Sequence, residues 1–250
     1  MKCSKTIKTE LCAYSVEACR TAARLGVNRV ELCASPAEGG VTPSYATIER
    51  VSKIEGLDLS VMIRPRGGDF LYSDEEFETM LQDIDYARRA GVTGVVFGVL
   101  TADGRVDVER TRQLVEASKG METTFHRAVD MTSDYEQAVE DVIAAGCTRI
   151  LTSGGYDKAI DGVENIARGV ARAQGRIEIM AGSGVVADCA LPLLEAGVDA
   201  LHFSAKRMVL GGMEYRNPRI SMGGSAAVDE FSLRVVDEAE VEKILTLIKK

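Results

Sequence analysis

The feature that most constrains the fold of this chain is a short motif that recurs along it. A helical stretch ends on a glycine and an apolar run begins within a few residues; the four copies contain Gly26, Gly91, Gly146 and Gly197. Glycine is the residue that most readily adopts the left-handed conformation that ends a helix. Repeated helix–glycine–strand joints with short links are typical of βα units, in which the strands run parallel.

Counting the apolar runs gives eight strands that alternate with eight helices. We expect strands near residues 6–12, 29–33, 58–64, 94–99, 122–126, 149–152, 177–181 and 200–204. We expect helices near residues 15–25, 44–53, 74–90, 106–118, 134–145, 162–174, 186–196 and 238–249. Because the 250 residues match the length of one (β/α)8 barrel, we predict an α/β protein with a single TIM-type barrel domain over residues 1–250.

One connection differs from the others. Residues 205–237 follow the last strand, are rich in glycine and methionine, and form a far longer link than the rest. A connection of this length in a compact domain is usually functional or part of an interface. We expect a long loop here, within which residues 208–222 form a substrate lid or a dimer arm.

The charges within the expected strands all fall on one side. Successive strand residues point to opposite faces, so Glu10 and Cys12 share a face that excludes Leu11, and Glu31 and Cys33 share the matching face of the next strand. A buried charge in a strand costs on the order of several kcal/mol unless it is paired or solvated. The pattern therefore predicts a polar barrel interior in which opposite charges neutralise each other. It also predicts a functional site at the mouth of the barrel, where the strands end.

The composition limits the partners. A net charge of −8 argues against binding to nucleic acid or to an anionic membrane. The N-terminus lacks an apolar signal core, and no apolar run approaches the roughly 20 residues of a membrane span. None of the six cysteines forms a C-x-x-C pair, which favours reduced thiols and a cytoplasmic protein.

A first candidate site follows the third strand. Arg64, Pro65 and Arg66 precede two glycines and Asp69. Two guanidinium groups around a proline can clamp a carboxylate or a phosphate, and Asp69 can orient one of them. The alternative is a salt bridge confined to the loop. Two arginines at the mouth of a barrel make this alternative the less favoured one.

A second candidate is His126, at the end of the fifth strand. An imidazole titrates near neutral pH and can act as a general acid or base. Asp130 or Glu31 could fix its tautomer, and Glu10 or Glu31 could carry a second proton. The alternative is a hydrogen-bonded histidine of the barrel interior without a chemical role.

A third candidate lies after the last three strands. Gly182, Ser183 and Gly184 open a helix, Ser204 ends the final strand, and Ser153 follows the sixth strand. Glycine-rich loops at helix starts present backbone N–H groups to anions, and barrels of this type often bind phosphate at the last two loops. The alternative is a tight turn that merely requires glycine.

The sequence Glu-Leu-Cys occurs at the ends of two neighbouring strands, where it places Cys12 and Cys33 at matching positions. Two thiolates suit Cu(I), a soft ion that accepts low coordination. Zinc would require four ligands, which nearby Glu and His residues could complete. The alternative is that both cysteines are small apolar fillers.

Taken together, these motifs resemble the CutC family of copper homeostasis proteins. The resemblance runs from the first strand to Ser232 and is most specific at residues 62–73 (MIRPRGGDFLYS); it also includes residues 31–33, 38–44, 96–107 (VFGVLTADGRVD), 124–130 and 151–154. Val129, where phenylalanine is frequent, and Gly155-Tyr156 depart from the family pattern. The resemblance implies a barrel fold, a cytoplasmic homo-oligomer (dimer or tetramer) and a role in copper trafficking, with Cys12 and Cys33 as the matching Cu(I) positions.

Two hypotheses remain open at this stage. In the first, the chain is a Cu(I)-binding homeostasis protein. In the second, it is an enzyme that performs acid–base chemistry on a small phosphorylated or carboxylated substrate, with His126 as acid or base. Copper binding needs only thiols, and it gives no reason for arginines, glutamates and a histidine at the same mouth.

Overall fold

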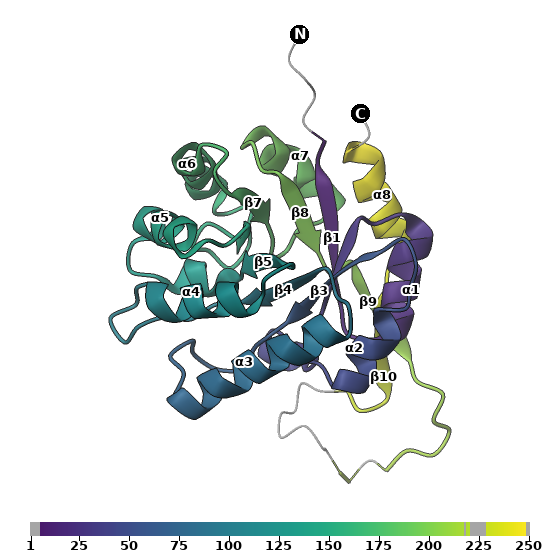
Figure 1. The fold of residues 1–250 in the computed structure, drawn as a ribbon. Coiled ribbons are helices and arrows are strands. Elements are labelled where there is room, and N and C mark those ends of the chain that lie inside the picture. Colours follow the sequence, from purple (N-terminus) through teal and green to yellow (C-terminus); the bar gives the residue numbers. More distant parts are fainter. Residues whose placement is uncertain (1–5, 218, 221–228, 249–250) are drawn as a thin grey trace.

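The barrel predicted from the sequence is confirmed by the structure, a computed structural model that describes residues 6–217, 219–220 and 229–248. Eight parallel strands close into one barrel in chain order, and β8 pairs with β1 (Figure 1). The strands are β1 (Lys8–Ala13), β2 (Arg29–Leu32), β3 (Asp58–Met62), β4 (Gly94–Phe97), β5 (Glu122–Phe125), β6 (Arg149–Thr152), β7 (Glu178–Ala181) and β8 (Ala200–Phe203).

Helices cover the outside of the barrel and alternate with the strands, as Figure 1 shows. They are α1 (Val16–Leu25), α2 (Tyr45–Val51), α3 (Asp74–Arg89), α4 (Val108–Ala117), α5 (Tyr135–Ala145), α6 (Val163–Ala173), α7 (Ala187–Glu195) and α8 (Glu238–Ile248). Two short 3-10 helices, η1 (Pro36–Glu38) and η2 (Arg127–Met131), follow β2 and β5.

Local capping explains where the helices begin and end. Ser73 caps α3 and forms a capping box with Glu76, in which each side chain accepts a hydrogen bond from the other residue's backbone. The helix α5 is capped by Asp134, whose side chain accepts a hydrogen bond from the backbone N–H of Gln137. Gly26 ends α1 in the left-handed conformation that the recurring motif predicts.

The two faces of the strands separate the molecule into an apolar layer and a polar interior. Leu11, Val30 and Phe125 are fully buried between the strands and the helices. The alternate positions place Glu10 and Arg29, also buried, inside the barrel. The alternation therefore holds as the sequence predicts, and it directs the ionisable groups toward one axis.

The long connection after β8 contains two strands that the sequence did not indicate. Strands β9 (Lys206–Leu210) and β10 (Ser232–Val236) form an antiparallel pair, which we call the hairpin. Figure 1 shows the hairpin at the end of the barrel opposite to the start of β1. The tip of the connection includes residues 218 and 221–228, which lie outside the described residues.

None of the helices in the described part of the chain combines the length and apolarity that a membrane crossing requires.

Candidate functional site

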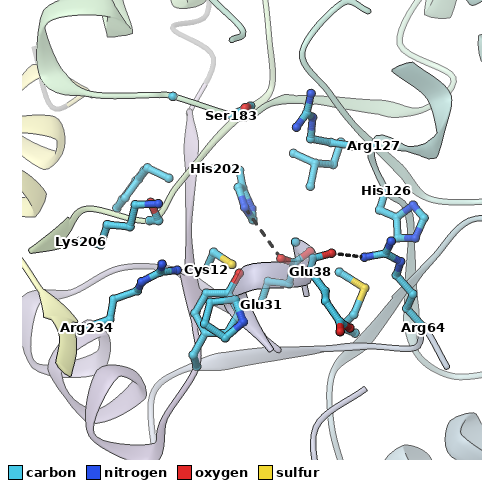
Figure 2. Close-up of a pocket in the computed structure, with 18 of the residues that line it drawn as sticks. Cys12, Glu31, Glu38, Arg64, His126, Arg127, Ser183, His202, Lys206 and Arg234 are labelled. Atoms are coloured by element: carbon cyan, nitrogen blue, oxygen red, sulfur yellow. Dashed lines mark hydrogen bonds and ion pairs between the residues drawn. The ribbon is translucent and has the colours of Figure 1, made fainter. Parts of the chain in front are cut away.

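A cavity of about 370 Å³ opens at the carboxyl ends of the barrel strands. Its lining comes from the ends of several strands, from the loops after them and from the hairpin. Figure 2 shows His202 near its centre, Arg64 and His126 on one side, and Lys206 and Arg234 on the other. This is the place where barrel enzymes and binding proteins hold their ligands.

Below the cavity, Glu10 joins β1 to its two neighbours. Its carboxylate accepts hydrogen bonds from Arg29 on β2 and from Nδ1 of His202 on β8, the latter at 2.8 Å. Burial alone disfavours the carboxylate, but the charges of Arg29 and His202 outweigh it and lower the pKa of Glu10 to about 2. Glu10 is thus a fixed anion that does not line the cavity, and it has no free proton to transfer near neutral pH.

Deeper in the barrel, the remaining charges pair with each other. Arg149 contacts Glu122 at 2.6 Å and Glu178 at 3.0 Å, and Lys8 lies 3.7 Å from Glu178. Although burial opposes it, hydrogen bonding to Glu178 raises the pKa of Arg149 above its usual value. This network fills the interior and joins neighbouring strands, in line with the expectation that opposite charges neutralise each other inside the barrel.

Cys12 and Cys33 come together at the ends of β1 and β2. Their sulfur atoms and a carboxylate oxygen of Glu31 all lie within 4.8 Å of one another. The Cys33 thiol contacts Glu31 Oε2 at 3.4 Å. Cys12 lines the cavity, whereas Cys33 is buried behind it, packed with Met62 and Val96.

The two thiols differ in acidity. The Cys33 thiol donates a hydrogen bond to Cys12 and lowers the pKa of Cys12 well below its ordinary value; His202 contributes to this shift, and burial opposes it. The hydrogen bond to Cys12 and burial both raise the pKa of Cys33. Burial also raises the pKa of Glu31 to about 8, although His202 opposes this shift. Burial disfavours a charged His202, but the surrounding carboxylates of Glu31 and Glu10 and the Cys12 sulfur raise its pKa well above normal.

His126 lines the cavity but is not oriented by a carboxylate. Its Nδ1 accepts a hydrogen bond from the backbone N–H of Ala128 at 3.2 Å, so neither Asp130 nor Glu31 fixes its tautomer. The proton of the neutral ring therefore lies on Nε2. Burial and the Arg64 guanidinium lower the pKa of His126 to about 3, so the ring is a neutral hydrogen-bond donor rather than an acid–base group near neutral pH.

The two arginines after β3 do not converge on one ligand. Arg64 lines the cavity and donates to the backbone carbonyls of Glu38, Gly40 and Gly68. Arg66 turns away from the cavity and pairs with Glu76 at 2.6 Å and with Asp69 at 3.1 Å. Asp69 thus contacts one of the two arginines, and the structure does not bring the two guanidinium groups to the same cavity.

The Asp130 carboxylate holds the loop after β6 in place. Its carboxylate accepts hydrogen bonds from the Thr152 hydroxyl, from the backbone of Ser153 and Gly155, and from Arg127. Ser153 is fully buried below the loop, where its hydroxyl oxygen accepts a hydrogen bond from Arg127. Arg127, which does line the cavity, is held in place by both residues.

The loops after β7 and β8 reach the cavity in part. Ser183, Gly184 and Ser204 line it, and Gly182 lies behind them against Leu151 and His202. Ser183 has a φ of 82°, a left-handed conformation that is uncommon for a residue with a side chain. Both loops therefore contribute residues to the mouth of the barrel.

Sequence reasoning assigned no role to several residues of the cavity. His202 lies on β8 opposite Glu10, and the alternation that places Glu10 inside the barrel was the available signal for it. Lys206 and Arg234 come from the two strands of the hairpin, a segment that resembled a loop, so no pattern in the sequence predicted them at the cavity.

Comparison with known proteins gives one consistent result. The model of the CutC family matches residues 7–207. A CutC family protein of Bacteroides fragilis is 46% identical over 242 residues, which are 96% of each chain. A human protein named copper homeostasis protein cutC homolog is 41% identical over 241 residues, which cover 96% of this chain and 88% of the human protein.

Solved structures agree with this similarity. The crystal structure of a CutC protein from Streptococcus agalactiae matches with a TM-score of 0.75 and 35% identity, and it covers 79% of this chain and 98% of that one. An aldolase matches with a TM-score of 0.62 at 18% identity, covering 82% of this chain and 92% of the aldolase. At this level of identity the aldolase is similar in fold alone.

Proposed function

The chain belongs to the CutC family, and from this premise we propose that it binds Cu(I) between Cys12 and Cys33 and takes part in copper trafficking in the cytoplasm. One observation carries the proposal: the ends of two adjacent strands hold both sulfur atoms within 4.8 Å of each other. Cu(I) is a soft ion that accepts two thiolate ligands.

The surroundings of the two sulfur atoms suit this ion. His202 lies beside Cys12, and its raised pKa supplies a positive charge that offsets the second negative charge of a bis-thiolate copper complex. Gly40 approaches Cys33 so closely that an added Cβ would lie 3.1 Å from the sulfur, so the loop after η1 covers Cys33. This cover shields one of the two thiolates from oxidants and from water.

Zinc fits the same residues less well. A closed zinc site needs four ligands, with histidine neutral. Beyond the two thiols, the neighbouring candidates are Glu31 and His202. Nδ1 of His202 is held by Glu10 at 2.8 Å, and the raised pKa of the ring keeps it protonated. The donor set therefore favours Cu(I) over Zn²⁺.

The test is a competition titration. Reduced protein without oxygen is titrated with Cu(I) against a chromogenic chelator, in a Cys3→Ser background that removes the one cysteine outside the described residues. We expect Cys12→Ser and Cys33→Ser each to abolish tight binding. Cys147→Ser should leave it intact, because Cys147 is a buried thiol of the main apolar core, outside the cluster that contains Cys12 and Cys33. Equal Cu(I) affinity in Cys12→Ser and in the parent protein would refute the proposal.

Two further features support the setting of this function. The described cysteines are all free thiols, which is typical of the reducing cytoplasm.

The hairpin exposes Met208, Leu210 and Leu233, of which Leu210 is 70% exposed, and clustered exposed apolar side chains favour an interface. We expect a homo-oligomer that Leu210→Glu weakens in sedimentation equilibrium; a monomeric parent protein would contradict this expectation.

A further inference from the structure

Two buried donors face the cavity without an acceptor. Nε of Arg64 and Nε2 of His126 have no hydrogen-bond partner among the described residues, and both side chains line the cavity. Buried polar atoms in folded proteins are almost always hydrogen-bonded. Two unpaired donors at one cavity therefore point to a ligand that supplies oxygen acceptors.

The charge of Arg64 strengthens this reading. Arg64 is 7% exposed, and within the described chain it forms no ion pair, because its terminal nitrogens donate only to backbone carbonyls. A buried guanidinium that is always charged and lacks a carboxylate favours an anion beside it. The ring of Phe70 lies 5.0 Å from both Arg64 and the His126 ring, so the two donors belong to one small patch.

The opposite side of the cavity offers a second group of donors. Lys206 and Arg234 of the hairpin line it, and neither forms an ion pair with any described residue. Ser183 and Gly184 after β7 have φ of 82° and 66°, and their backbone N–H groups donate to no other described residue. Ala205 after β8 is also left-handed, with φ of 35°. Strained backbone at both loops is typical of a ligand site.

We propose that the mouth of the barrel binds a small phosphorylated molecule, with its phosphate near Ser183, Lys206 and Arg234 and a carboxylate or carbonyl oxygen at Arg64 and His126. Figure 2 shows these two groups on different sides of one cavity. A volume of about 370 Å³ suits a metabolite with a short carbon chain. The site uses donors other than the two thiols, so it goes beyond the copper proposal and does not depend on it.

The test is calorimetric titration of the reduced, copper-free full chain with three probes. Phosphoglycolate carries both anionic groups, glycerol phosphate carries the phosphate alone, and glycolate carries the carboxylate alone. We expect phosphoglycolate to bind on the order of tenfold more tightly than either partial probe, because each end adds charge-assisted hydrogen bonds.

Variants assign each end of the ligand. The double variant Lys206→Gln/Arg234→Gln should weaken both phosphorylated probes by about tenfold. Arg207→Gln is the matched control, because Arg207 lies on the same strand as Lys206 but does not line the cavity. His126→Phe should remove the preference for phosphoglycolate over glycerol phosphate while leaving glycerol phosphate binding unchanged.

Two results would overturn the proposal. One is the absence of heat with both phosphorylated probes up to about 10 mM. The other is binding that the double hairpin variant does not change. Cys12→Ser/Cys33→Ser should bind phosphoglycolate as the parent chain does, so failure of the copper proposal and failure of this one give different results.

Discussion

The guanidinium of Arg29 forms a fully buried ion pair with the carboxylate of Glu10 on the neighbouring strand. The same carboxylate accepts a hydrogen bond from His202 on the other side. One anion therefore links three consecutive strands of the closed barrel, β8, β1 and β2. Through His202, which lies beside Cys12, this interior pair also positions the candidate metal site.

The first prediction concerns this pair. Arg29→Met removes the ion pair of the buried Glu10 carboxylate and leaves His202 as its hydrogen-bonded partner, and we expect a loss of about 3 kcal/mol in the free energy of unfolding, measured by urea denaturation. Arg29→Met/Glu10→Gln should lose less than the sum of the two single changes, because no unpaired charge remains. Arg88→Ala removes an exposed ion pair with Asp85 and should leave stability nearly unchanged. Additive losses would show that the pair is not coupled.

The second prediction concerns the close packing of His126 against Gly98, the residue that follows β4. A Cβ added at Gly98 would lie 2.5 Å from Nδ1 of His126 and 2.9 Å from the Ala128 side chain. Gly98→Ala should therefore lower the free energy of unfolding by about 1–3 kcal/mol, the usual cost of overpacking. It should also weaken phosphoglycolate binding, because the ring must move.

Gly212→Ala is the control, because a Cβ at that position meets nothing within 4 Å. Its melting temperature should match that of the parent protein. Equal melting temperatures for the two variants would contradict the packing that the structure shows around His126.

The fold could be predicted closely because its signals are local. The glycine of each motif copy ends a helix, as Gly26 and Gly146 show by their positive φ, and a buried strand follows. Alternation then fixed the inner face, because a one-residue shift would have placed Glu10 and Arg29 among the helices. The hairpin was missed because its strands are mostly exposed and lack an apolar alternation.

The site could be predicted only in part, because side-chain direction after a strand ends is not periodic. Glu31, Cys12 and His126 lie on or next to the strands and reach the cavity as expected. Arg66 lies beyond the strand end and turns to Glu76, a residue of the helix that follows. Such choices depend on tertiary partners that no spacing in the sequence reveals.

The third prediction concerns the reactivity of the thiols. The pKa of Cys12 is lowered, whereas burial raises the pKa of Cys19 to about 12 and of Cys147 to about 12. Because the thiolate is the reactive form, iodoacetamide at pH 7 should modify Cys12 before either of the other two, as measured by peptide mass spectrometry. His202→Asn removes the neighbouring positive charge and should slow this modification. A rate at Cys12 no higher than at Cys147 would contradict the lowered pKa.

The fourth prediction concerns pH and follows from the neutral state of His126. Its pKa falls from 6.5 to about 3 on folding, because burial and the positive charges of Arg64 and Arg127 disfavour the protonated ring. Between these two values the unfolded chain binds a proton that the folded chain does not, so the folded state loses stability as the pH falls from 6.5 toward 3. The expected slope from this group approaches about 1.4 kcal/mol per pH unit.

His126→Gln isolates this contribution, because carboxylates elsewhere in the chain titrate equally in both proteins. Glutamine keeps a polar side chain at the position but cannot gain a proton. We expect the free energy of unfolding in urea to fall less between pH 7 and pH 5 in the variant than in the parent chain. Identical falls in the two proteins would mean that His126 is protonated in the folded state, and its Nδ1 could then no longer accept the Ala128 hydrogen bond.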